Sequence, residues 1–293
     1  MFQKCGADYV KTNQRAPPAS RASPLDRCCS LDGDADRIVF YFNDRNNVFR
    51  LLDGDRIATL AASFIGDLAR QSGLIEKLNI GVVQTAYANG AATAYVEKHL
   101  GLQLVFTPTG VKHLHHAATR FDVGVYFEAN GHGTVVFSPS ALKTIHTHEP
   151  QSPAQADALG TLVALTELIN QTVGDALSDM LLVEVILAHK SYSCVEWLNT
   201  YTDLPNRLVR VEVSDRNLFT TVEGTAERKL ATPVSAQDEI DKLVAKYKDG
   251  RAFARASGTE DAVRVYAEAA TSPEAKDLAN GVAQIVRKFG SGK

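Results

Sequence analysis

The chain has 293 residues, 45% of them hydrophobic, and a formal net charge of −3 at pH 7. This length supplies enough apolar material for two hydrophobic cores and the remnant of a third. The small negative charge argues against nucleic acid or an anionic membrane as the main partner, and no apolar run approaches the roughly 18 residues of a membrane-spanning helix.

The first predicted unit is a strand, an acidic loop and a second strand within Cys28–Phe42. The loop carries Asp32, Asp34 and Asp36 at alternate positions. Carboxylates at this spacing can direct their oxygens at one hard cation, and a Mg²⁺ ion held there keeps coordination positions open for a phosphate. A solvated acidic turn before a buried strand is the alternative.

Two other interpretations of this loop fit the sequence less well. A calcium-binding EF-hand loop needs Gly at its sixth position and Glu at its twelfth, where this chain has Arg37 and Asn43. A metal phosphatase would use Asp32 as its nucleophile and would need a hydrophobic strand leading into it. Cys28–Leu31 provides such a strand only weakly.

Helix and strand signals alternate through residues 53–200, as is typical of βαβ units in an α/β fold. In Asp53–Arg70 the apolar residues have helical spacing, and Asp53 is suited to cap the helix. Ligand loops of parallel sheets follow the C-terminal ends of strands, so we expect Glu128, which follows a strand, to lie at a site. The further elements expected here are strands at Ile80–Gln84, Gln103–Phe106, Val123–Phe127 and Thr134–Phe137, and helices at Ala91–His99, Val111–Arg120, Ala154–Thr172 and Ala176–Ala188.

The pattern changes after the turn-rich segment Asp203–Asn206. A smaller α+β unit is expected from there to the end of the chain. Its predicted elements are strands at Leu208–Val213, Arg251–Arg255 and Val263–Glu268, and helices at Ala236–Tyr247 and Pro273–Phe289.

The connection between the strands that end at Phe127 and begin at Thr134 carries chemically versatile side chains. Glu128, Asn130 and His132 offer a carboxylate, an amide and an imidazole close to glycines. Such a turn suits hydroxyl-rich ligands. A histidine with a purely structural role in the turn is the alternative for His132.

Residues 255–260 have the composition of a phosphate-binding turn. Arg255, Ser257 and Thr259 contribute a guanidinium and two hydroxyls, and Gly258 allows backbone N–H groups to approach an anion. Arg264 follows on the next strand and is close enough in sequence to reach the same anion. An ordinary hairpin connection is the alternative.

Cysteine and histidine residues give no sign of a zinc site. The four cysteines lack CxxC spacing, and without a secretory context we expect reduced thiols in a cytoplasmic protein. Five histidines lack a cysteine or carboxylate at ligand spacing, so we interpret them as helix-surface or loop residues. They are His113, His115, His116, His146 and His148.

Together and in this order, the three loops resemble those of the α-D-phosphohexomutases, specifically the C-terminal part of the phosphoacetylglucosamine mutase family. The spelling Glu-Ala-Asn-Gly-His at residues 128–132 is typical of this branch, whereas glucose and mannose phosphate mutases usually carry a Gly-Glu-x-Ser-Gly-His type of loop. The chain departs from the family at Ala256, where Pro is usual. Four further stretches resemble the same branch: Asn79–Ala92, Thr109–His116, Gly174–Glu184 and Tyr201–Arg207.

This resemblance implies an isomerase that interconverts the 6-phosphate and 1-phosphate of N-acetylglucosamine for UDP-N-acetylglucosamine synthesis. N-acetylglucosamine phosphates would be its ligands and Mg²⁺ its cofactor, held by Asp32, Asp34 and Asp36. Arg37 and His132 would be catalytic, and because an arginine with a pKa above about 12 is a poor acid, we expect Arg37 to stabilise charge. The residues implied in substrate binding are Lys112, Glu128, Ala129, Asn130, Gly131, His132, Arg255, Ser257, Gly258, Thr259 and Arg264. For Lys112, a solvated helix lysine is the alternative.

The resemblance also divides the chain into three domains. Residues 1–50 would be the remnant of a second domain with the metal loop. Residues 51–200 would be a third, mixed βαβ domain of phosphohexomutase type with the sugar loop, and residues 201–293 a small α+β C-terminal domain that binds phosphate.

The family's phosphoryl donor is not found in this sequence. In the family, a phosphoserine in a Thr-Ala-Ser-His-Asn-Pro loop of the first domain donates the phosphoryl group, and no serine here is followed by His-Asn-Pro. We therefore expect that the first domain is missing and that this chain alone is inactive. A non-catalytic sugar-phosphate-binding fragment or pseudoenzyme is the alternative function.

Overall fold

The computed structural model describes residues 4–290 and forms two compact units. The first unit comprises residues 1–84, 92–105 and 110–202, and the second comprises residues 85–91, 106–109 and 203–293. The predicted domains 1–50 and 201–293 include the first three and last three residues, which lie outside the described part. None of the helices within residues 4–290 has the length and apolar character needed to span a bilayer.

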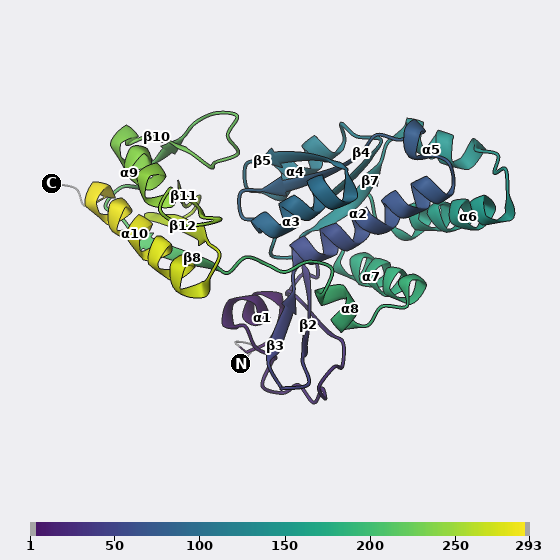
Figure 1. The fold of residues 1–293 in the computed structure, drawn as a ribbon, viewed down its shortest axis with the longest axis horizontal. Helices are drawn as coiled ribbons and strands as arrows, with labels where there is room; N and C mark the ends of the chain where they lie inside the picture. Colours follow the sequence, from purple (N-terminus) through teal and green to yellow (C-terminus); the bar gives the residue numbers. More distant parts are fainter. Residues whose placement is uncertain (1–3, 291–293) are drawn as a thin grey trace. The chain divides into compact units, whose positions relative to one another are not determined.

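An antiparallel sheet of three strands holds the acidic loop in the first unit (Figure 1). Its strands are β1 (Cys28–Leu31), β2 (Ile38–Asn43) and β3 (Phe49–Leu52). Leu31 pairs with Ile38, so the two ends of the loop between β1 and β2 are adjacent. The sequence did not predict β3.

Strand β2 is buried on both faces, which explains its continuous apolar run. Phe40 belongs to the large core of the first unit, whereas Val39 and Tyr41 pack on the other face against Val10. Val10 belongs to α1 (Ala7–Asn13), a short helix that the sequence did not predict. Helix α1 therefore covers the face of this sheet that is opposite the large core.

A second sheet in the first unit has the strand order β5-β4-β6-β7. Strands β4 and β6 are parallel, as predicted, and β6 and β7 are antiparallel, so the sheet is mixed, in agreement with the expected mixed βαβ domain. The reason is the short connection between β6 and β7, which closes a hairpin, whereas a parallel pair needs a long crossover. The bounds are β4 (Ile80–Thr85), β5 (Gln103–Thr107), β6 (Val123–Phe127) and β7 (Gly133–Phe137).

Helix α2 (Gly54–Gln71) lies against β6 and helix α6, and its N-cap Asp53 accepts a hydrogen bond from the backbone N–H of Asp55. Both its helical spacing and its cap were predicted. The remaining helical elements of this unit are η1 (Ile75–Lys77), α3 (Gly90–Ala94), which continues as the wider π-helical segment η2 (Tyr95–Leu100), α4 (Val111–Ala118), α5 (Pro139–Thr147), α6 (Pro153–Leu168), α7 (Ala176–Lys190) and α8 (Cys194–Leu198).

Helix α8 brings the chain's single tryptophan into the core of the first unit. Trp197 is 1% exposed, and its ring meets that of Phe40 edge to face with centroids 5.5 Å apart. The indole N–H donates a hydrogen bond of 3.2 Å to the carbonyl oxygen of Arg56. The polar end of this large side chain is therefore satisfied inside the core.

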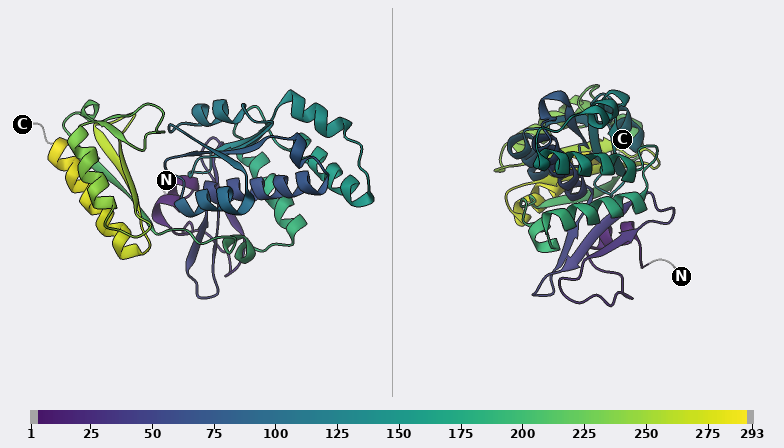
Figure 2. Two further views of the ribbon diagram at one scale, coloured as in Figure 1. Left: turned by 45° about the horizontal axis from the view of Figure 1, so that its top comes forward. Right: turned by 90° about the vertical axis from the view of Figure 1, so that its right-hand side faces the viewer.

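The second unit is built on an antiparallel sheet of order β11-β12-β8. Helices α9 and α10 lie side by side and pack on one face of it, where valines of β8 and β12 contribute to the core (Figure 2). The predicted strands and helices of this unit are confirmed, and the short strands β9 and β10 are additional. The bounds are β8 (Asn206–Glu212), η3 (Arg216–Leu218), β9 (Thr220–Thr221), β10 (Leu230–Thr232), α9 (Val234–Val244), β11 (Arg251–Ala256), β12 (Ala262–Glu268) and α10 (Ser272–Gly290).

Candidate active site

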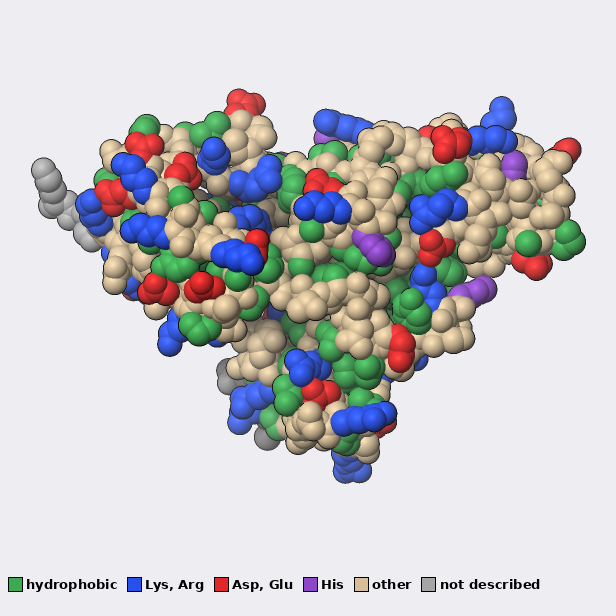
Figure 3. All heavy atoms as spheres, viewed as in Figure 1, with side chains coloured by type: hydrophobic (Ala, Val, Ile, Leu, Met, Phe, Trp, Pro, Cys, Tyr) green, Lys and Arg blue, Asp and Glu red, His purple; other side chains and the backbone are tan. Residues whose placement is uncertain are grey.

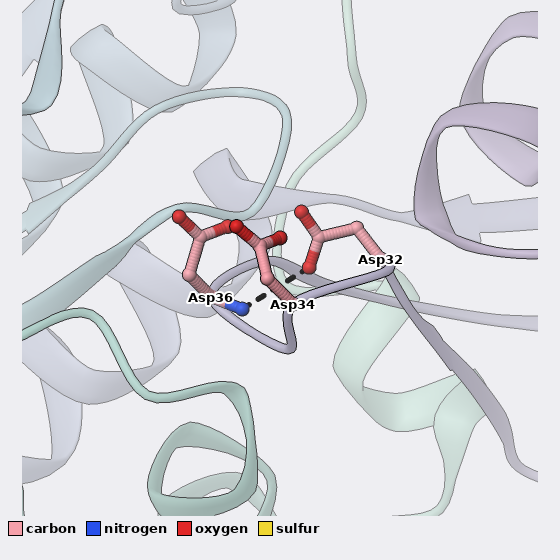
Figure 4. Close-up of side chains that lie close together, drawn as sticks. All are labelled: Asp32, Asp34 and Asp36. Carbon is pink, nitrogen blue, oxygen red and sulfur yellow. Dashed lines mark hydrogen bonds between the residues drawn. The ribbon is translucent and has the colours of Figure 1, made fainter.

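The acidic loop between β1 and β2 brings its three carboxylates together. One oxygen from each of Asp32, Asp34 and Asp36 lies within 4.8 Å of the others. Figure 4 shows all three side chains on the same side of the loop. Such a set of oxygen atoms fits a small hard cation.

Hydrogen bonds from Arg37 and the loop backbone fix Asp32. Its Oδ1 accepts bonds from the backbone N–H groups of Asp36 at 3.1 Å and Arg37 at 3.0 Å, and its Oδ2 accepts one from Arg37 Nε at 2.7 Å. Burial by itself opposes ionisation, but these bonds outweigh it and lower the pKa of Asp32 to about 2. Asp32 is therefore ionised at neutral pH, and hydrogen bonds to both of its oxygens fix its orientation.

Arg37 is held from two sides. Besides its bond to Asp32, its Nη1 donates a bond of 2.7 Å to Asp8 of helix α1. Lys11 of the same helix also stabilises the site, because it donates a hydrogen bond of 2.8 Å to Asp53 and another to the carbonyl oxygen of Ala129. Asp8 and Lys11 carry no local sequence signal for this site, since only the fold brings α1 to the loop.

The loop of residues 128–132, between β6 and β7, lies directly against the acidic loop. Arg37 and His132 form an antiparallel backbone bridge, and the N–H of Ile38 donates to the carbonyl oxygen of Gly131 at 3.2 Å. His132 Nδ1 is 3.6 Å from Asp36 Oδ2. Two of the three predicted ligand loops therefore form one continuous surface.

Two glycines allow this close approach. Gly131 has φ of +91°, and a Cβ there would lie 1.8 Å from the carbonyl oxygen of Ile38. Gly174, which precedes helix α7, faces the imidazole, and a Cβ there would lie 2.5 Å from the ring of His132. The placement of His132 therefore requires glycine at both residue 131 and residue 174.

The other predicted sugar-binding residues differ in their surroundings. Glu128 Oε1 accepts a bond of 3.1 Å from the N–H of Gly110, at the start of α4. Asn130 Oδ1 accepts the N–H of His132 at 3.0 Å and so helps to shape the turn, and Ala129 contributes its carbonyl oxygen to Gly54 at 3.4 Å. Lys112 is exposed on the first turn of α4 and has no hydrogen-bond partner within residues 4–290.

Two of the histidines that we interpreted as surface or loop residues, and not as zinc ligands, lie within hydrogen-bond distance of protein groups. His115 Nδ1 lies 3.0 Å from the hydroxyl of Tyr126, and His148 Nε2 lies 2.9 Å from the carbonyl oxygen of Ser72. Within residues 4–290, the group of side chains able to share a metal ion is the aspartate triad.

The predicted phosphate loop connects β11 and β12 in the second unit. Arg255 and Arg264 are direct partners across these strands, so their side chains emerge on the same face. Ser257 is 6% exposed and donates its N–H to the carbonyl oxygen of Ala262 at 2.8 Å. Gly258 and Thr259 are exposed, and a Cβ added at Gly258 would meet no atom within 4 Å.

Two residues without a local sequence signal, Tyr87 and Glu227, hold Arg255. Its Nε donates a bond of 3.0 Å to the hydroxyl of Tyr87, and its Nη1 lies 3.3 Å from Glu227 Oε1. The other oxygen of Glu227 accepts bonds from the N–H and hydroxyl of Thr109. Tyr87 and Thr109 come from short segments that the fold adds to the second unit, so local spacing gave no signal for them.

Comparison with known proteins identifies the family. The models of phosphoacetylglucosamine mutase AMG1 domain II and domain III match residues 1–39 and 53–192, and that of the phosphoglucomutase/phosphomannomutase C-terminal domain matches residues 208–285. The phosphoacetylglucosamine mutase of Candida albicans is 53% identical over 97% of this chain, and that of Homo sapiens is 50% identical over 98%. The chain belongs to the phosphoacetylglucosamine mutase family. The resemblance inferred from the three loops is thereby confirmed.

A crystal structure of Aspergillus fumigatus N-acetylphosphoglucosamine mutase, in complex with GlcNAc-6P and magnesium, is 70% identical with a TM-score of 0.95. The match covers 97% of this chain and 56% of that one. The chain spans about half the length of the curated phosphoacetylglucosamine mutases it matches, 52% for Candida albicans and 53% for Homo sapiens.

Proposed function

We propose that this chain supplies the metal-, sugar- and phosphate-binding part of a phosphoacetylglucosamine mutase, which interconverts the 6-phosphate and 1-phosphate of N-acetylglucosamine. The observation that carries the proposal is the convergence of three carboxylates directly beside the 128–132 loop. Support comes from the 70% identical Aspergillus fumigatus mutase, whose structure holds GlcNAc-6P and magnesium.

The donor set of the acidic loop fits Mg²⁺, because three carboxylates present only oxygen and lie within 4.8 Å of one another. Asp32, Asp34 and Asp36 would hold the ion. When bound, it would neutralise negative charge on a phosphoryl group. Arg37, fixed by Asp32 and Asp8, adds a second positive charge at the same place.

The remaining residues bind and orient the sugar phosphate. Glu128 and His132 would hydrogen-bond the sugar hydroxyls and so align the reacting one. Arg255, Arg264 and the amides around Gly258 would bind the phosphate that does not react.

A ligand titration followed by NMR tests the proposed site. We expect N-acetylglucosamine 6-phosphate to shift the amides of Ser257, Gly258 and Thr259, and unphosphorylated N-acetylglucosamine to leave them unchanged. Arg264→Ala should weaken phosphate binding more than about tenfold, because a charge-assisted hydrogen bond contributes about 1.5 to 3 kcal/mol. Equal shifts with both sugars would reduce the loop to an ordinary turn.

The metal is tested by a Mg²⁺ titration of the same protein. Asp34→Asn should weaken Mg²⁺ binding, whereas Asp157→Asn, on the exposed face of α6, should leave it unchanged. Equal Mg²⁺ affinity in wild type and Asp34→Asn would remove the acidic loop from the proposal.

A sugar-phosphate binder without catalysis is the second candidate. The absence of a Ser-His-Asn-Pro sequence from these 293 residues favours it. The two functions predict the same binding and differ only in turnover.

A further inference from the structure

The face of the second unit's sheet opposite helices α9 and α10 carries a row of three arginines. Arg264 on the central strand β12 is the direct cross-strand partner of Arg255 on β11 and of Arg210 on β8. Directly opposed residues of antiparallel strands point to the same face, and like charges placed there destabilise the sheet. The row therefore requires negative charge close by.

Glu260, in the β11–β12 loop, supplies part of that charge and divides its two oxygens between two arginines. Its Oε1 accepts a bond of 2.6 Å from Arg264 Nη2. Its Oε2 accepts two bonds from Arg210, at 3.0 Å from Nε and 2.7 Å from Nη2. Arg210 thus binds Glu260 through two hydrogen bonds (a two-point grip), whereas Arg264 binds it through one.

The acidity of Glu260 agrees with this asymmetry. The pKa of its carboxyl lies below the usual value chiefly because of the hydrogen bonds from Arg210, with Arg264 the smaller electrostatic contributor. The side chains of Arg210, Glu260 and Arg264 are 42%, 33% and 34% exposed. Ion pairs this accessible to water exchange partners at little cost.

This geometry affects phosphate binding, because the guanidinium of Arg264 already has an anionic partner from its own loop. A phosphate that approaches Arg264 must replace Glu260 there or share the arginine with it. If Glu260 loses only its Oε1 bond, the two bonds from Arg210 still satisfy its charge.

We propose that Glu260 is an internal counter-anion of Arg264 and that Arg210 is a positioning residue that retains Glu260 when phosphate takes its place. The inference rests on the proposed function, in which Arg264 binds phosphate. Arg210 acts through Glu260 and makes no contact with the ligand. Figure 3 shows side chains of both signs interspersed on the visible face of this unit.

A double-mutant cycle with inorganic phosphate as the probe tests the inference. Binding is followed at low ionic strength by the amide shifts of Ser257, Gly258 and Thr259. Glu260→Gln should tighten phosphate binding about threefold, because the competing charge is gone. Arg210→Gln should weaken it about threefold, because Glu260 is left with Arg264 as its main partner.

The decisive result is the coupling between the two changes. In the Glu260→Gln background, Arg210→Gln should have almost no further effect, because the carboxylate that it positions is absent. Arg210→Lys, which keeps the charge but not the two-point grip, should fall between wild type and Arg210→Gln. Arg207→Gln removes the same charge from the same strand and should behave alike in both backgrounds.

Two outcomes would overturn the inference. An equal loss on Arg210→Gln in both backgrounds would mean that Arg210 acts on phosphate directly or by its charge alone. Unchanged or weaker binding by Glu260→Gln would mean that Glu260 does not compete. A wild-type chain whose loop amides ignore phosphate would instead contradict the proposed function and remove the premise of the inference.

Discussion

Asp179, on helix α7, is buried inside the first unit. Its side chain is 1% exposed, and neither carboxylate oxygen has a hydrogen-bond partner within residues 4–290. Burial, with the nearby charge of Asp175, raises the pKa of Asp179 well above its usual value. The folded chain therefore keeps this carboxyl protonated at a pH where the unfolded chain ionises it.

Stability should consequently fall as pH rises, because the unfolded state releases a proton that the folded state retains. The loss begins near the unfolded pKa, about 3.9, and continues up to the raised folded value. We expect Asp179→Asn to remove this pH dependence, so that the variant's gain in unfolding free energy over wild type is larger at pH 7.5 than at pH 4.

Urea unfolding at the two pH values measures this difference. Any fixed effect of burying an amide in place of an acid cancels, since it is present at both. Asp157→Asn, at an exposed position on α6, is the matched control and should show no such pH dependence. A variant curve parallel to that of wild type would mean that Asp179 finds a partner in solution.

Residue types and spacing were sufficient to place the acidic loop between two strands and residues 257–261 in another such connection, because the members of each segment lie within a few positions of one another. They were insufficient for Asp8, Tyr87 and Glu227. Each of these bonds to a site arginine from a distant part of the sequence. Only the completed fold makes such partners neighbours.

At the scale of elements, the N-terminus of helix α7 joins the acidic loop to the rest of the first unit. Asp175 caps the helix by accepting the N–H groups of Leu177 and Ser178, and its other oxygen accepts a bond from the amide of Asn170. The first N–H of the helix, that of Ala176, donates to the carbonyl oxygen of Ala35 in the acidic loop. The cap therefore also stabilises the end of α7 that contacts the loop.

Asp175→Ala should lower the unfolding free energy by about 1 to 2 kcal/mol, since it removes an N-cap together with the bond to Asn170. The hydrogen bond from Asn170, and those from the helix N–H groups, lower the pKa of Asp175. The contribution of ionised Asp175 to the unfolding free energy is therefore fully present above the pKa that this carboxyl has in the unfolded chain. It declines as pH falls through the lower pKa that the carboxyl has in the folded chain. Chemical denaturation at neutral and acidic pH checks both, and an equal loss at every pH would contradict the pKa assignment.

Local pattern predicted the long amphipathic helices α2 and α10 well, because each repeats its apolar spacing over several turns. It failed for α1 and β3, whose few residues are too short for a period to emerge. It also gave no direction for the last strand of the mixed sheet. There the length of the β6–β7 connection, and not strand composition, decides the pairing.

At the scale of the whole molecule, the described residues include the three proposed ligand loops, but the sequence has no Ser-His-Asn-Pro motif. Positioning and charge stabilisation without a phosphorylated nucleophile leave no donor for the transfer. We expect the purified 293-residue chain to show no conversion of N-acetylglucosamine 6-phosphate to the 1-phosphate, even with glucose 1,6-bisphosphate added as a primer.

A coupled assay measures this conversion, with the 70% identical Aspergillus fumigatus mutase as the positive control. Sustained turnover by the chain alone would show that another group replaces the serine phosphate. Binding of the 6-phosphate without turnover is the expected combination.

Trp197 makes the two units optically distinguishable. The chain has one tryptophan, and its indole is enclosed in the core of the first unit against Phe40. Selective excitation therefore reports on that unit alone, and the unit that carries Arg255 and Arg264 contributes nothing to the emission. A thermal melt recorded by this intrinsic fluorophore and again by backbone circular dichroism can thus assign each transition to its unit without any attached label.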